Sequence, residues 1–153
     1  LQAIEAVNRE RPGSCATIIR IKPGRERGVF EEFTKQYCQS ALILGAECEE
    51  GRDVILGSDI LVGTTTIMLQ TAACLKVLPI SYMPNLCRSD PQIANSLGII
   101  KTIYRQGELG DFLRSATAET IQEELACLKR IEMPKDARSR VAKALEKIGQ
   151  GET

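Results

Sequence analysis

Short apolar runs alternate along this chain with stretches in which apolar residues recur every three or four positions. The runs, bounded by Pro, Gly or Asn, are typical of strands, and the wider spacing is typical of helices. We expect strands at residues 15–21, 41–44, 59–62, 77–82 and 99–104. We expect helical stretches at residues 1–10, 29–37, 52–57, 65–75, 92–97, 109–115, 118–131 and 134–148.

The order of these elements predicts the fold class. Strands that are apolar throughout, separated by helices, indicate a parallel sheet covered on both faces. We therefore expect an α/β protein with a Rossmann-like, doubly wound parallel sheet in three α/β/α layers, followed by C-terminal helices. Among these helices, Thr117 is placed to cap the one that begins at Ala118, and Leu125 and Leu128 give that helix an apolar face.

Composition narrows the possible functions. The 153 residues suffice for a single domain, residues 1–153, and they include 20 basic and 20 acidic residues. A net charge of zero and an aromatic content of 4% argue against a nucleic-acid partner. No run is long and apolar enough for a transmembrane segment, and no signal peptide precedes the domain, so we expect a cytoplasmic protein.

The chain has six cysteines and no histidine. No two cysteines have Cys-x-x-Cys spacing, so we expect neither a metal centre nor a bound cofactor. Cys15, Cys74 and Cys127 have apolar neighbours in the sequence and are expected in the core of a protein from a reducing compartment. Without histidine, the usual acid–base group near neutral pH is missing, and we assign no catalytic residue.

The stretch from Asp59 to Ala73 carries the main functional signal. It predicts a buried strand that ends at Gly63, a turn of three threonines, and a helix. Such a turn leaves backbone N–H groups free at the positive end of the helix dipole, which favours an anion and above all a phosphate. Thr65 or Thr66 is also expected to cap the helix, which is compatible with phosphate binding.

Polar residues at the other strand ends extend this site, because ligands of doubly wound sheets bind beyond the carboxyl ends of the strands. Basic groups, helix N-terminal amides and hydroxyls on one rim suit a diphosphate, and the loop before the last strand offers groups that bind sugar hydroxyls. The candidate substrate-binding residues are Arg20, Lys22, Gly63, Thr64, Thr65, Thr66, Ser81, Asp90, Gln92 and Asn95. Arg25 and Arg27 either join them or form only a solvated helix start. The chain has no Gly-x-Gly-x-x-Gly and no Walker loop.

Three stretches carry a resemblance. The segment from Ala16 to Pro23 resembles a strand ending in Arg-x-His-Pro, and Ser58–Thr66 with Ala72-Ala73 and Ile80–Tyr82 resembles a diphosphate-binding stretch. Residues 90–98 resemble the loop that approaches the donor sugar. In these stretches the chain resembles the C-terminal domain of GT-B type glycosyltransferases and of the related UDP-N-acetylglucosamine 2-epimerase group, in particular members from surface and capsular polysaccharide synthesis.

The chain departs from this family pattern at three positions. Lys22 stands where the family has His, Thr71 where the helix usually carries a ribose-binding Glu, and Leu78 where Pro is common. Thr71 is shorter than Glu and uncharged, which places ribose binding at that position in doubt. Diphosphate binding by Gly63–Thr66 does not depend on it.

The resemblance implies a nucleoside diphosphate sugar as ligand and an N-terminal domain of the same protein as partner, because GT-B enzymes bind both substrates between two Rossmann-like domains. We expect the chain to be the nucleotide-sugar-binding part of a glycosyltransferase or a sugar-nucleotide epimerase, without catalytic activity alone. The alternative is a non-catalytic Rossmann-like binding or assembly module with a decayed site.

Overall fold

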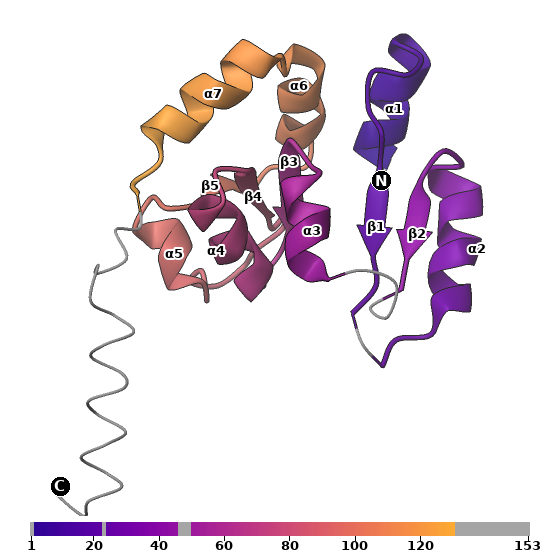
Figure 1. Cartoon of the computed structure of the whole chain (residues 1–153), viewed down its shortest axis with the longest axis horizontal. Helices are drawn as coiled ribbons and strands as arrows, with labels where there is room; N and C mark the ends of the chain where they lie inside the picture. The colour runs from indigo at the N-terminus through magenta and orange to yellow at the C-terminus, as the bar shows by residue number, and fades with distance from the viewer. Residues whose placement is uncertain (1, 23, 46–49, 131–153) are drawn as a thin grey trace, which may run out of the picture.

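The computed structural model describes residues 2–22, 24–45 and 50–130, and it confirms the α/β class (Figure 1). Its helices are α1 Gln2–Glu10, α2 Arg27–Tyr37, α3 Gly51–Leu56, α4 Ile67–Cys74, α5 Ile93–Ser96, α6 Glu108–Ser115 and α7 Ala118–Cys127. Its strands are β1 Ile18–Arg20, β2 Leu42–Leu44, β3 Ile60–Gly63, β4 Leu78–Tyr82 and β5 Lys101–Ile103. The helix expected at 134–148 lies outside the described residues.

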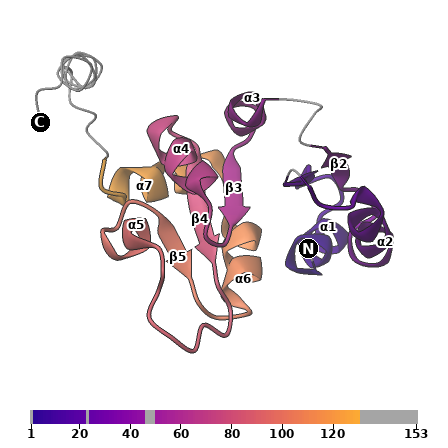
Figure 2. The ribbon, with the colours of Figure 1, turned by 90° about the horizontal axis from the view of Figure 1, so that it is seen from below.

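All strand pairs are parallel, and they form two sheets. One sheet has the order β3-β4-β5, with Gly63 beside Ser81 and Ser81 beside Thr102. The other consists of β1 and β2, with Arg20 beside Leu44. In both views the β1–β2 pair lies to one side of the three-stranded sheet (Figures 1 and 2), and no ladder among the described residues joins β1 to β3.

Helices cover both faces of the three-stranded sheet. Leu78, Ile80 and Ile103 point to one face and pack against Leu109 of α6 and the apolar side of α7. On the opposite face Leu61 packs against Leu69 of α4 and Ala94 of α5. Figure 1 shows α6 and α7 on one side of the strands and α4 and α5 on the other. Because it lies between its two neighbours and under both helix layers, β4 is buried along most of its length.

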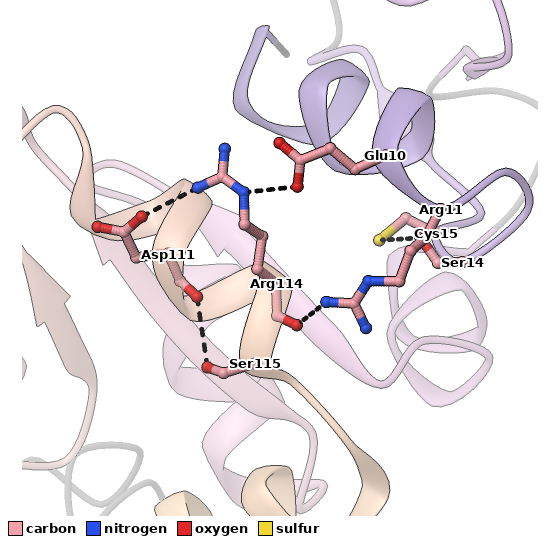
Figure 3. A network of polar contacts seen from close by, with 7 residues as sticks. All are labelled: Glu10, Arg11, Ser14, Cys15, Asp111, Arg114 and Ser115. Carbon is pink, nitrogen blue, oxygen red and sulfur yellow. Dashed lines mark hydrogen bonds and ion pairs between the residues drawn. The ribbon is translucent and has the colours of Figure 1, made fainter.

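Contacts between α1 and α6 join the β1–β2 pair to the larger sheet (Figure 3). The Arg114 guanidinium lies 2.9 Å from a carboxylate oxygen of Glu10 and 2.9 Å from one of Asp111. Arg11 donates a hydrogen bond to the backbone carbonyl of Arg114. A Cβ added at Gly110 would lie 3.7 Å from the Cβ of Ala3, so the two helices pack closely at this glycine.

Several elements are shorter than expected, and for β1 and α7 the structure shows a local reason. The first strand begins at Ile18, because the side-chain amide of Asn8 hydrogen-bonds both the N–H and the carbonyl of Cys15 (2.9 and 3.0 Å). Helix α7 ends at Cys127, because Leu128 is extended and the N–H of Lys129 donates to the carbonyl of Gly98 at 2.8 Å.

The expected start of α7 is confirmed. The Thr117 hydroxyl accepts the N–H of Thr120, and the Thr120 hydroxyl accepts the N–H of Thr117, which forms a capping box. Leu125 and Leu128 pack against the core, as expected. Within the part of the chain that the structure describes, no helix combines the length and the apolar character needed to cross a membrane.

The prediction for the cysteines is wrong in part. Cys74 and Cys127 are exposed, Cys15 is half-buried, and Cys38, which we had not selected, is buried. In α4 the side chains of Leu69 and Ala72 face the sheet, and Cys74 follows Ala72 by two positions, so it points away from the core.

Candidate functional site

The turn between β3 and α4 has the geometry expected of a helix N-terminal anion site. Thr66 is the N-cap, and its hydroxyl accepts the N–H of Met68 at 3.3 Å. The structure provides no acceptor among the described residues for the N–H groups of Thr65, Thr66 and Ile67. Thr64 and Thr65 are exposed, so a ligand can reach this turn from solvent.

Glycine is required at position 63 because the end of β3 lies very close to the first turn of α4. A Cβ at this position would lie 3.0 Å from the Thr66 methyl and 3.6 Å from Leu69. The strand end and the first turn of α4 are therefore in contact at Gly63, and a larger residue would displace the cap.

A network of hydrogen bonds connects this turn to the loop before β5. The Ser81 hydroxyl donates to the carbonyl of Thr64 at 3.0 Å and accepts the side-chain amide of Asn95 at 3.0 Å. The same Asn95 amide donates to Asp90 at 2.8 Å, and the hydroxyl of Tyr104 donates to the same Asp90 oxygen at 2.6 Å. The second Asp90 oxygen accepts the N–H of Gln92 at 2.8 Å. These bonds bring together the ends of β3, β4 and β5.

The network changes the acidity of its titratable members. Desolvation raises the pKa of Asp90, but hydrogen bonds from Tyr104, Asn95 and the N–H of Gln92 outweigh it and leave the pKa below the usual carboxyl value. The hydrogen bond to Asp90 raises the pKa of Tyr104, followed by desolvation and the negative charge of Asp90. Asp90 is therefore an anion and Tyr104 a neutral donor at neutral pH.

Two buried amide side chains, one within this network and one next to it in sequence, have unused hydrogen-bonding capacity. Gln92 is 7% exposed and Asn95 is 9% exposed. Among the described residues, neither the nitrogen nor the oxygen of the Gln92 amide has a partner, and the Asn95 amide oxygen has none. Buried amides are usually paired, and an unpaired one marks a place where an ordered water or another polar group can complete the hydrogen bonds.

Arg20 reaches the site from the other sheet. One guanidinium nitrogen lies 3.8 Å from the sulfur of Met68, in the first turn of α4, and the guanidinium also borders Gly51 at the start of α3. A positive charge thus lies beside the side chain of Met68, a residue of the first turn of α4. Lys22, two residues further along the chain, is exposed.

An open pocket of about 530 Å³ lies at the same edge, where the loops after β4 and β5 meet. It is lined by Asn85, Leu86, Arg88, Asp90, Tyr104, Arg105 and Gln106. Of these, only Asp90 is among the candidate substrate-binding residues predicted from the sequence. Tyr104 was missed because we assigned it to the last strand, whereas it is the first residue after β5. Its position at a carboxyl strand end was the signal that could have identified it.

The comparisons with known proteins are negative. No family model, curated protein or solved structure matches the chain.

The candidate site therefore has to be interpreted from its own geometry. It combines open helix N-terminal amides, a nearby guanidinium, and amide, hydroxyl and carboxylate groups at adjacent strand ends. The open amides of the turn can hold an anion, whereas the side chains of Ser81, Gln92 and Asn95 are buried. Asp90 accepts three hydrogen bonds from the protein, so its main role is to position the loop.

Proposed function

We propose that the chain binds a nucleoside diphosphate sugar, as the nucleotide-sugar-binding domain of a glycosyltransferase or sugar-nucleotide epimerase. The observation that carries this proposal is the hydrogen-bonded chain from Thr64 through Ser81 to Asn95. It connects the carbonyl of Thr64, in the threonine turn, to the side chain of Asn95, a buried amide whose oxygen has no partner among the described residues.

In this proposal the N–H groups of Thr65, Thr66 and Ile67 hold the diphosphate, and Arg20 neutralises part of its charge. Backbone donors at a helix N-terminus suit phosphate oxygens, and their positions are fixed before the ligand arrives. The amides of Gln92 and Asn95 bind hydroxyl groups of the sugar. Catalysis requires groups from a second domain, the N-terminal domain of a GT-B protein, because this chain has no histidine to act as a general base near neutral pH.

One observation favours a second candidate, a binding or assembly module without catalytic partners. The hydroxyl of Thr71 donates to the carbonyl of Ile67 within its own helix at 3.3 Å. The hydroxyl is therefore already engaged within the helix, at the position where the family that this chain resembles carries a ribose-binding carboxylate. A module of this kind would hold phosphate but discriminate poorly among nucleosides.

Titration of the ¹⁵N-labelled chain with UDP, followed by amide NMR, tests the proposal. We expect UDP to shift the amide signals of residues 63–67, and uridine, which has no phosphate, to leave them unchanged. The Gly63→Val variant should lose the response, because its side chain displaces Thr66. Gly28→Val is the matched control, since a Cβ at Gly28 meets nothing within 4 Å.

The outcomes separate the two candidates. If millimolar UDP moves none of these signals, phosphate binding at this turn is wrong. If UDP and inorganic pyrophosphate bind equally well, the nucleoside is not recognised and the decayed module is favoured.

A further inference from the structure

Helix α4 lacks the charged outer side that a helix on a protein surface usually has. None of its residues is charged, yet only Leu69 and Ala72 are buried. Ile67, at its first position, is 69% exposed. A helix that is apolar on most sides is usually covered on most sides. The outer side of α4 is therefore typical of a surface on which another element packs.

The neighbouring helix α5 has the same property. It contains no charged residue, and Ile93 and Leu97 are 74% and 48% exposed. The N–H of Leu97 donates to the carbonyl of Ile93 at 3.0 Å, so these side chains lie one turn apart on one side of α5. Both helices cover the same face of the sheet, where Leu69 of α4 and Ala94 of α5 share a core cluster (Figure 1). We refer to the outer sides of these two helices, with Ile67, Ile93 and Leu97, as the α4–α5 surface.

The described part of the chain ends beside this surface. After α7 the N–H of Lys129 donates to the carbonyl of Gly98 at 2.8 Å, and Gly98 directly follows Leu97. A Cβ added at Gly98 would lie 4.0 Å from the Cγ of Lys129. Figure 1 shows the chain passing from the end of α7 to α5. The sequence beyond Arg130 therefore continues from a point next to the exposed side chains of α5.

That sequence has an apolar stripe of its own. In the helix expected at residues 134–148, apolar side chains recur at helical spacing and share one side of the helix, whereas the other positions are mostly charged. A helix of this length is marginally stable in water unless its apolar side is covered. The residues of the stripe are Ala137, Val141, Ala144, Leu145 and Ile148.

We propose that residues 134–148 fold back on their own chain as an amphipathic helix and cover the α4–α5 surface with this stripe. The connection from Arg130 to Pro134 spans at most about 14 Å. A helix over 134–148 is about 22 Å long, enough to start beside α5 and extend over α4. So short a connection keeps the stripe at an effective concentration in the millimolar range, which favours its own chain over another copy. The contact goes beyond the proposed function and does not depend on nucleotide binding.

Methyl NMR on the whole chain tests the contact. We expect nuclear Overhauser effects (NOEs) between methyl groups of the stripe and those of Ile93 and Leu97. Leu145→Lys places a charge within the stripe and should abolish the NOEs that the other stripe residues give. Ser139→Lys adds the same charge on the opposite side of the expected helix, so this matched control should keep them. Unchanged signals from β3, β4 and β5 show that each variant still folds.

Amide hydrogen exchange gives a second readout. Residues 137–148 should exchange at least about tenfold more slowly than unprotected amides, because the docked helix must open before it exchanges. Ile93→Lys changes the other side of the contact and should remove this protection, as Leu145→Lys does.

Three results would overturn the inference. The first is exchange at the unprotected rate without NOEs to α5. The second is an equal effect of Leu145→Lys and Ser139→Lys, which would show that the stripe does not mediate the contact. The third is NOEs found only between differently labelled chains in a mixed sample, which would show that the helix docks on a second copy.

Discussion

The substitution Asn95→Asp tests the network that organises the candidate site. It keeps the size of the side chain and replaces the amide nitrogen, which donates to both Ser81 and Asp90, with a second carboxylate oxygen. At pH 7 this removes a neutral hydrogen bond, worth about 1 kcal/mol, and one to a charged acceptor, worth about 2 kcal/mol. It also places two carboxylates in hydrogen-bonding contact.

Proton uptake limits the cost of that repulsion. The introduced carboxyl binds a proton once the repulsion exceeds the free energy of protonation, which at pH 7 is about 4 kcal/mol for a usual aspartate pKa. We therefore expect the free energy of unfolding to fall by about 3 to 4 kcal/mol at pH 7. Since the protonated group can again donate to Asp90, the loss should shrink to about 1 kcal/mol near pH 4.

The sign of this pH dependence is diagnostic. The pKa of the introduced carboxyl is raised in the folded state, so the folded protein binds more protons than the unfolded chain and the variant gains stability as the pH falls. Urea unfolding of both proteins at pH 7 and pH 4 measures it. Asn85→Asp, an exposed substitution in the preceding loop, is the control for a simple change in net charge. A loss below 1 kcal/mol at pH 7, or a loss that grows on acidification, would refute the network.

Two further substitutions test neighbouring contacts. Tyr104→Phe should lower stability by about 1 kcal/mol and raise the pKa of Asp90 towards its usual value, measured by carboxyl ¹³C NMR. Because the pKa of Asp90 is lowered in the folded protein, its contribution to the free energy of unfolding is present above the usual carboxyl pKa and is lost as the pH falls through the lowered value. The control is Tyr82→Phe, which removes no hydrogen bond to Asp90 and should leave the pKa of Asp90 unchanged. Thr117→Ala should cost about 1 kcal/mol in urea unfolding, because it opens the capping box of α7, and a neutral result would contradict the observed cap.

The positions of the elements were predictable because local signals mark them. Apolar runs ended by Gly or Pro located the strands, and Thr66 and Thr117 marked helix starts through side-chain hydroxyls that accept backbone N–H groups. The structure also brings four of the candidate site residues, Thr64, Ser81, Asp90 and Asn95, into one hydrogen-bond network. Its residues follow strand ends, and a parallel sheet brings strand ends together.

What could not be predicted depends on contacts between distant segments. No periodicity shows which strand edges pair, so the division into two sheets was not foreseen. The partners of Asp90 were equally hidden, because Tyr104 is 14 residues away in sequence and reaches it only when β5 lies beside β4. Burial of cysteines was misjudged because apolar sequence neighbours do not reveal which side of a helix faces the core.

The packing of α1 against α6 has a consequence for the order in which the chain folds. The polar contacts between Glu10, Arg11 and Arg114 join residues 103 and 104 positions apart, so the entropy of closing that loop must be offset before they contribute. During synthesis, α1 and the β1–β2 pair emerge well before α6 exists. The strands β1 and β2 have three residues each, and a two-stranded sheet by itself is marginally stable, so this part has only a small core of its own with α1 and α2. The part of the chain from α1 to β2 should therefore acquire lasting structure only after residue 115 has been made, because α6 supplies the contacts that hold it.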